Sequence, residues 1–212
     1  MITLQGKYDR NINIACSGGV DSMAATDFFS RKHNCNLIFF DHATDASRDA
    51  KELLQDYVSD KNSVFRSTPD ATTLTFQTST IQRKKEKSES WEEYWRNERY
   101  SCFHSIGENV ITCHHLDDCV ETWIWSSLHG NGKLIPFRNK NVVRPFRLNR
   151  KTQFVNWCRR FSVPWAEDAS NVDTKYMRNY IRKELIDKCL VVNPGLHKVI
   201  QKKIRKEDVN DL

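Results

Sequence analysis

The residues best suited to chemistry in this chain form the run 17–22, which reads Ser-Gly-Gly-Val-Asp-Ser. An apolar run at 12–16 precedes it and helix-like apolar spacing follows, so the order predicts strand, tight turn and helix N-terminus. Consecutive glycines bring several backbone N–H groups to one point, and the helix adds unpaired N–H groups and partial positive charge. The turn therefore predicts a phosphate or pyrophosphate site. Its candidate residues are Ser17, Gly18, Gly19, Val20, Asp21 and Ser22.

This turn differs from the two common glycine-rich phosphate loops. The Walker loop needs a Lys-Ser/Thr pair after its second glycine, the dinucleotide fingerprint needs G-x-G-x-x-G, and this turn matches neither. Two serine hydroxyls and the carboxylate of Asp21 stand here instead. Because a carboxylate repels phosphate, Asp21 is a candidate ligand of a Mg²⁺ ion that bridges to phosphate oxygens. The alternative is an ordinary strand–helix turn whose glycines allow close packing.

A second cluster of reactive side chains follows another predicted strand and opens a predicted helix, in the run Cys-His-His-Leu-Asp-Asp-Cys-Val-Glu-Thr. Its carboxylates Asp118 and Glu121 are three residues apart, and Asp117 and Glu121 are four apart, so they share a helix face. Carboxylates massed at a strand end suit magnesium binding or general-base catalysis. His114 and His115 could contact a phosphate or a base edge.

Three simpler interpretations of this cluster stay open. Its cysteines and histidines could bind zinc, although their spacing matches no common zinc site. The acids could do no more than stabilise the helix N-terminus by their charge. The two histidines could be ordinary packed side chains.

Length and composition restrict the protein class. A chain of 212 residues suits one domain with a small appendage. No apolar run approaches the ~20 residues of a membrane span, and the N-terminus lacks the basic start and apolar block of a signal peptide. The seven cysteines include no C-x-x-C pair and read as reduced thiols. We therefore expect a cytoplasmic protein without a membrane segment.

The formal net charge of +6 is moderate, but basic residues gather in the C-terminal half. This distribution favours a polyanionic partner, most simply RNA or DNA. A solvated basic face is the alternative. The basic residues are Arg138, Lys140, Arg144, Arg147, Arg150, Lys151, Arg159, Arg160, Arg178, Arg182, Lys183, Lys198, Lys202, Lys203, Arg205 and Lys206.

Strand and helix patterns alternate along the chain. The expected strands are 12–16, 36–41, 64–65, 109–113 and 142–143, and the expected helices are 22–32, 47–59, 91–106, 115–128, 151–161 and 173–190. We expect a long exposed loop at 66–90. The alternation predicts an α/β fold, a doubly wound, mostly parallel five-stranded sheet with a small helical C-terminal extension. Ligands of such sheets bind at the carboxyl ends of the strands, where both motif loops fall.

With both motifs in order, the chain resembles the tRNA(Ile)-lysidine synthetase family, in a short form with the catalytic domain only. Residues 17–22 resemble the PP-loop of the N-type ATP pyrophosphatase superfamily, and residues 114–122 match the family's His-His-x-Asp-Asp-x-x-Glu-Thr motif. Further matching segments are residues 40–42 (Phe-Asp-His), 47–50 (Ser-Arg-Asp-Ala), 95–100 (Trp-Arg-Asn-Glu-Arg-Tyr), 144–146 (Arg-Pro-Phe), 165–171 (Trp-Ala-Glu-Asp-Ala-Ser-Asn), 178–182 (Arg-Asn-Tyr-Ile-Arg) and Pro194.

The resemblance implies an ATP-dependent ligase. ATP adenylates C2 of the wobble cytidine of tRNA(Ile) with a CAU anticodon, and free lysine then displaces AMP to form lysidine. It implies ATP and Mg²⁺ as cofactors, with Asp21 and Asp118 as metal ligands. The implied catalytic residues are Asp21, Asp118, Glu121, Arg178 and Arg182, and the implied substrate-binding residues are His42, His114, His115, Asp117 and Asn179.

The resemblance also implies a division of the chain. Residues 1–150 would form the adenylation domain, and residues 151–212 a helical basic extension that completes the site and binds the tRNA anticodon loop. Family members usually continue into further domains that hold the acceptor arm. We therefore expect the grip on tRNA to come from the basic tail, a partner or a homodimer. Trp95 replaces a usual small residue and His129 a usual arginine.

Three rival functions remain. A tRNA 2-thiolation enzyme would use the same adenylation step, although such enzymes often carry C-x-x-C pairs. An amidating synthetase of the NAD or GMP type would share the phosphate loop. A catalytically inactive tRNA-binding module would bind RNA with strong salt dependence and release no pyrophosphate.

Overall fold

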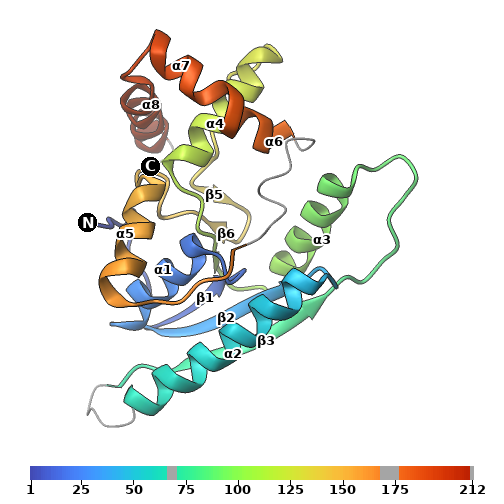
Figure 1. Ribbon diagram of the computed structural model, residues 1–212, viewed down its shortest axis with the longest axis vertical. Coiled ribbons are helices and arrows are strands. Elements are labelled where there is room, and N and C mark those ends of the chain that lie inside the picture. The colour runs from blue at the N-terminus through green and yellow to red at the C-terminus, as the bar shows by residue number, and fades with distance from the viewer. Residues whose placement is uncertain (66–70, 168–176, 211–212) are drawn as a thin grey trace.

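The computed structural model describes residues 1–65, 71–167 and 177–210. Within them a six-stranded sheet has the order β3-β2-β1-β4-β6-β5 (Figure 1). Every strand pairing is parallel except the antiparallel pair β5–β6. The predicted α/β fold with a mostly parallel sheet is confirmed. The strands are β1 (Asn11–Ala15), β2 (Asn34–Asp41), β3 (Leu74–Thr80), β4 (Val110–Ile111), β5 (Arg138–Asn139) and β6 (Val142–Val143).

The helices connect the strands and extend the chain beyond the sheet. Figure 1 shows α6, α7 and α8 grouped around α4, at the opposite end of the molecule from α2. A π-helical segment, Ile181–Leu185, joins α6 to α7. The α-helices are α1 (Val20–Ser30), α2 (Asp45–Phe65), α3 (Trp91–Ser105), α4 (Leu116–Leu128), α5 (Lys151–Phe161), α6 (Met177–Tyr180), α7 (Ile186–Val192) and α8 (Leu196–Asn210).

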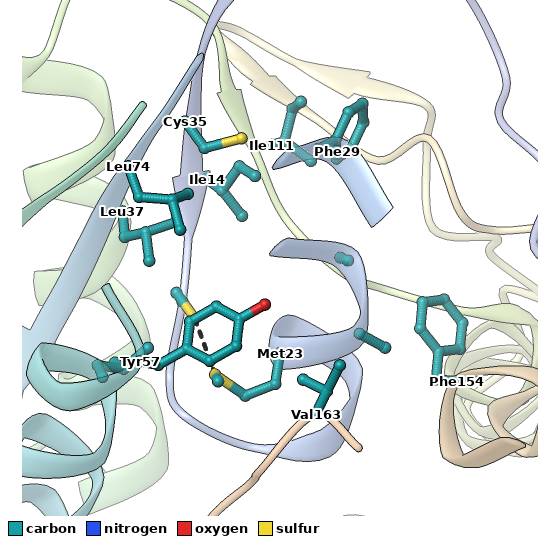
Figure 2. Packing of buried hydrophobic residues seen from close by; sticks show 14 of the residues in the cluster. Ile14, Met23, Phe29, Cys35, Leu37, Tyr57, Leu74, Ile111, Phe154 and Val163 are labelled. Carbon is teal, nitrogen blue, oxygen red and sulfur yellow. Dashed lines mark hydrogen bonds between the residues drawn. The ribbon is translucent and has the colours of Figure 1, made fainter. Parts of the chain in front are cut away.

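The main core lies between the sheet and helices α1, α2 and α5. Successive side chains of a strand point to opposite faces, so Leu37 of β2 joins this core while its neighbour Ile38 packs against Phe103 of α3 on the other face. Burial on both faces explains the continuous apolar run in β2. Figure 2 shows strand residues such as Leu37 packed with Met23 of α1 and Tyr57 of α2.

A separate apolar cluster joins α4 to the C-terminal helices. Val120 and Ile124 of α4 pack with Ile181 of the π segment and with Ile200 and Ile204 of α8. The C-terminal helices therefore pack on α4, whereas α5 packs in the main core with α1. The division near residue 150 stays a prediction.

Three expectations about local structure are wrong. Residues 64–65 are not a strand but the end of α2, and β3 lies inside the segment expected to be a loop. β3 has few large apolar residues, since only Leu74 and Phe76 face the core, so its pattern was weak. The short strand β5 was missed, which gives six strands instead of five. Positions 66–70 and 173–176 of the expected elements lie outside the described residues.

None of the described helices combines the length and apolar character that a membrane crossing requires.

Candidate active site

The predicted phosphate loop links β1 to α1, and two glycines shape it. Gly18 has a φ of +80°, and a Cβ there would lie 3.0 Å from the Cβ of Ala50 in α2. Gly19 is the N-cap of α1, and among the described residues no side chain caps the helix there. The hydroxyl of Ser22 donates to Gly19 O at 2.9 Å and accepts from Ser17 N at 3.2 Å. Hydrogen bonds of Ser22 thus hold the loop together, and the start of α1 has no side-chain cap among the described residues.

Asp21 lies in the first turn of α1 and reaches towards the second motif. Its Oδ2 is 3.6 Å from His115 Nε2 and 3.9 Å from Lys151 Nζ. Its Oδ1 is buried and accepts no hydrogen bond from the described residues. A buried carboxylate oxygen without a donor is costly. A hard cation such as Mg²⁺ would satisfy this atom, because Mg²⁺ takes one or two carboxylates and completes its shell with phosphate and water.

His115 connects the two motifs. It is the N-cap of α4, where its Nδ1 accepts from Asp118 N at 3.3 Å while Asp118 Oδ2 accepts from His115 N at 2.9 Å. This reciprocal pair forms a capping box. Burial opposes a charge on the ring, but the carboxylates of Asp118 and Asp21 raise the pKa of His115. With Nδ1 accepting, Nε2 carries the proton, so it faces Asp21 as a donor.

Asp118 and Glu121 of α4 meet Arg178 and Arg182 of the C-terminal helices, and these four residues form an acid–arginine cluster. Glu121, only 2% exposed, accepts from Arg182 Nε at 2.7 Å, from Arg182 Nη2 at 3.0 Å and from Arg178 Nε at 3.1 Å. Asp118 Oδ1 lies 3.4 Å from Arg178 and 3.6 Å from Arg182. Burial opposes ionisation of Asp118, but His115 and Arg178 lower its pKa to about 2. Asp118 is therefore held ionised, and Glu121 lies between two guanidinium groups.

Ile181, which lies between Arg178 and Arg182 in the sequence, anchors this part of the chain on α4. Ile181 is buried in the α4–α8 cluster, and Arg178 and Arg182 flank it at a spacing of four residues. Residues four apart share a helix face, so anchoring Ile181 aims both guanidinium groups at α4. Arg182 lies in the π segment, and π-helical turns often occur at functional sites.

Asp117 belongs to a structural network rather than to the acid–arginine cluster. Its Oδ2 accepts from Lys151 N at 2.7 Å, and its Oδ1 lies 3.1 Å from Arg150 Nε and 3.3 Å from His197 Nε2. Although burial opposes ionisation, these donors hold the pKa of Asp117 below its usual range. Both oxygens thus serve to join α4 to the start of α5 and to α8.

The remaining predicted residues lie around this centre. His114 Nδ1 is 3.0 Å from Thr112 Oγ1, and burial lowers the pKa of His114 to about 3, so the ring is neutral near pH 7. His42 lies just beyond the end of β2, packed between the rings of Phe40 and Trp95. Asn179 lies on α6 between the two arginines. The contacts above thus join Asp21, His115, Asp118, Glu121, Arg178 and Arg182.

Two neighbours of the site were not predicted as functional. Lys151 approaches Asp21, and His197 of α8 holds Asp117. Lys151 stood out in the sequence only as one of many basic residues. His197 lies 80 positions beyond Asp117 on a helix whose packing the local pattern did not reveal.

Zinc and thiol chemistry lack geometric support here. Across residues 1–65, 71–167 and 177–210, no group of three or more His, Cys, Asp and Glu side chains is placed to hold a metal ion. All seven cysteines are free thiols. Burial raises the pKa of Cys16 and Cys113 beside the phosphate loop, so both are protonated at neutral pH and poor nucleophiles.

Comparison with known proteins gives two groups of relatives. The chain is 38% identical over 121 residues to the tRNA(Ile)-lysidine synthase of Persephonella marina, covering 53% of this chain and 26% of that protein. It is 24% identical over 205 residues to the Vibrio parahaemolyticus enzyme of the same name, covering 89% of this chain and 44% of that protein. The chain therefore spans less than half the length of these relatives.

Among solved structures, the chain is similar to the U34-tRNA thiolase NcsA from Methanococcus maripaludis, which was determined with its iron–sulfur cluster. The TM-score is 0.70 with 11% identity, covering 94% of this chain and 72% of NcsA. Identity this low shows a shared fold alone. The sequence profile of the PP-loop domain family matches residues 2–189, which include the glycine turn and the acid–arginine cluster. The chain therefore belongs to the PP-loop domain family.

Proposed function

We propose that this protein is an ATP-dependent ligase that adenylates C2 of the wobble cytidine of tRNA(Ile) with a CAU anticodon and joins lysine to it, forming lysidine. The contact from Asp21 through His115 to Asp118 carries this proposal, because it brings the predicted phosphate loop and the carboxylates of α4 together. Curated relatives that match part of this chain are named tRNA(Ile)-lysidine synthase. ATP and tRNA are cytoplasmic substrates, so we propose the cytoplasm as the site of action.

In the first step, the triphosphate binds at residues 17–22. The C2 oxygen of cytidine attacks the α-phosphorus, the bond to the β-phosphate breaks, and pyrophosphate leaves. Such transfers depend on positioning and charge neutralisation, which backbone N–H groups at the start of α1 supply. Asp21 Oδ1, buried and without a donor, would hold Mg²⁺, whose charge would offset that of the phosphates. His115 keeps Asp21 oriented through Nε2.

In the second step, the ε-amine of lysine attacks C2 and AMP leaves with the C2 oxygen. The amine needs a carboxylate to bind its ammonium form and a base to take its proton. We propose Asp118 and Glu121 for these roles. In the structure Arg178 and Arg182 pair with these acids, and both arginine side chains remain partly exposed. We propose that the phosphates of ATP draw the arginines away, which frees the carboxylates for the amine.

The RNA itself needs a cationic surface. Helix α8 presents five exposed cations, and a hollow beside it is lined by Lys203, Lys206 and Glu207 and by the loop at Gly132 and Leu134. We propose that this helix contacts the phosphate backbone, since such contacts supply most of the sequence-independent affinity. A homodimer that extends this surface stays a prediction, which sedimentation analysis would test. The cations are Lys198, Lys202, Lys203, Arg205 and Lys206.

Transfer of labelled lysine to RNA tests the proposal. The protein is incubated with an unmodified tRNA(Ile) transcript carrying CAU, ATP–Mg²⁺ and labelled lysine, and a transcript with a changed wobble base serves as control. We expect label retained on the CAU transcript alone, with stoichiometric AMP and pyrophosphate. Pyrophosphate release without retained lysine contradicts the lysine assignment and favours a different acceptor, such as sulfur in 2-thiolation. RNA binding without pyrophosphate release indicates a binding module.

A further inference from the structure

A row of aromatic rings runs outward from the end of β2. The ring of His42 lies 5.1 Å from that of Phe40 and 5.6 Å from that of Trp95, and Trp95 lies 5.5 Å from Trp91. The row begins at the sheet with the buried Phe40 and ends at Trp91, a residue that is 55% exposed. Four rings in successive contact thus lead from the carboxyl end of β2 to the exposed Trp91.

This row lies next to the candidate active site. β2 pairs directly with β1, whose carboxyl end carries the phosphate loop. His42 follows β2 at this same end, so the row and the phosphate loop both lie at the carboxyl ends of neighbouring parallel strands.

Local contacts fix the outer rings in place. Ser90 caps α3 by accepting from Glu93 N at 3.1 Å, which orders the turn that carries Trp91. Lys85 Nζ lies 5.5 Å from the Trp91 ring, and the planes of Trp91 and Trp95 are inclined by 37°. An exposed tryptophan whose orientation is already fixed loses little conformational entropy when a flat ligand stacks on it.

We propose that Trp91 and Trp95 form a stacking platform for an unpaired base of the RNA substrate. The proposal depends on the proposed function only in taking RNA as the substrate. Aromatic side chains bind single-stranded RNA by stacking, because every base has a π face. A base that arrives from solvent meets Trp91 first. Lys85 Nζ lies beside its ring, and the first two turns of α3 carry the exposed Arg96 and, at 92–93, two exposed glutamates.

Binding of a hairpin RNA with an unpaired loop, measured by fluorescence anisotropy without ATP, tests the platform. We expect Trp91→Ala to weaken hairpin binding at least about five-fold, the lower end of the loss per stacked base, and Trp91→Phe to restore most of it. Affinity for a fully paired RNA of equal length and for ATP should not change. Trp125→Ala is the matched control, because Trp125 of α4 is 46% exposed and its ring lies 4.6 Å from that of His129, the C-cap of α4.

The possible outcomes separate this proposal from the proposed function. Unchanged hairpin affinity in Trp91→Ala, an equal loss in Trp125→Ala, or a loss of ATP affinity instead would overturn the platform. Normal lysine transfer by the wild-type protein together with any of these results leaves the ligase function standing. Hairpin binding that depends on Trp91, in a protein that releases no pyrophosphate, supports the platform and contradicts the ligase.

Discussion

A double-mutant cycle on Glu121 and Arg182 separates the structural role of their contact from a catalytic one. Arg182 makes two bonds to Glu121, at 2.7 and 3.0 Å, and Glu121 is 2% exposed while the Arg182 side chain is 30% exposed. Breaking a fully buried pair costs about 3–5 kcal/mol. Because Arg182 is partly solvated and Arg178 also holds Glu121, we expect Glu121→Gln to lower the free energy of unfolding by about 2–3 kcal/mol.

Arg182→Gln should cost a similar amount, because it leaves part of the Glu121 carboxylate without a donor. The double variant should cost less than the sum of the two, with a coupling energy of about 1–2 kcal/mol measured by urea denaturation. Lysidine formation should behave differently. We expect Glu121→Gln to reduce turnover more than about ten-fold without lowering ATP affinity, and the double variant should not recover that loss.

Two results would refute this reasoning. Unchanged turnover in Glu121→Gln would reduce the acid cluster to a helix-packing contact. Full recovery of turnover in the double variant would show that the lost activity came from misplaced helices and not from a missing carboxylate.

The remaining predictions concern stability. The pKa of Asp118 falls from 3.8 to about 2 on folding, so its contribution of about 2 kcal/mol is present above pH 4 and lost as the pH falls towards 2; urea titrations at stepped pH should show this loss, and Asp118→Asn should remove it. Gly18→Ala should cost at least ~1 kcal/mol, because φ is +80° and Ala50 is close; thermal melting checks this. Asp27→Asn should cost about 3 kcal/mol in urea, since this fully buried carboxylate accepts from Lys61 at 2.6 Å and from three other side chains, whereas the exposed Arg31→Gln should cost under ~1 kcal/mol. Equal losses of unfolding free energy in Asp27→Asn and Arg31→Gln would contradict the view that the buried Asp27 carboxylate holds its four partners together.

Local patterns were enough to predict the central strands and both motif loops. β1 and β2 are apolar runs bounded by turn residues, and the glycines at 18 and 19 mark the turn into α1. Parallel strands end at the same edge of a sheet, so the meeting of Asp21 with the second motif also followed from the order of the elements. The order of the elements thus predicts that the six-residue turn and the His-His-Leu-Asp-Asp run lie close together.

Long-range pairing determined what the pattern did not reveal. β3 is a largely polar strand stabilised by hydrogen bonding along the whole of β2, which no local periodicity records. The assignment of Asp117 to a structural network depends on Lys151 and His197, which are distant in the sequence. The pairing of Arg178 and Arg182 with Glu121 likewise needs the anchoring of Ile181 on α4, a contact between segments about 60 residues apart.

The most direct test of the central idea is a crystal structure with a non-hydrolysable ATP analogue, Mg²⁺ and lysine. We expect the phosphates on the N–H groups of residues 17–22, the metal on Asp21 Oδ1, and the lysine ammonium against Asp118 and Glu121. A triphosphate bound elsewhere, or lysine bound apart from these acids while Arg178 and Arg182 keep their present partners, would contradict the account.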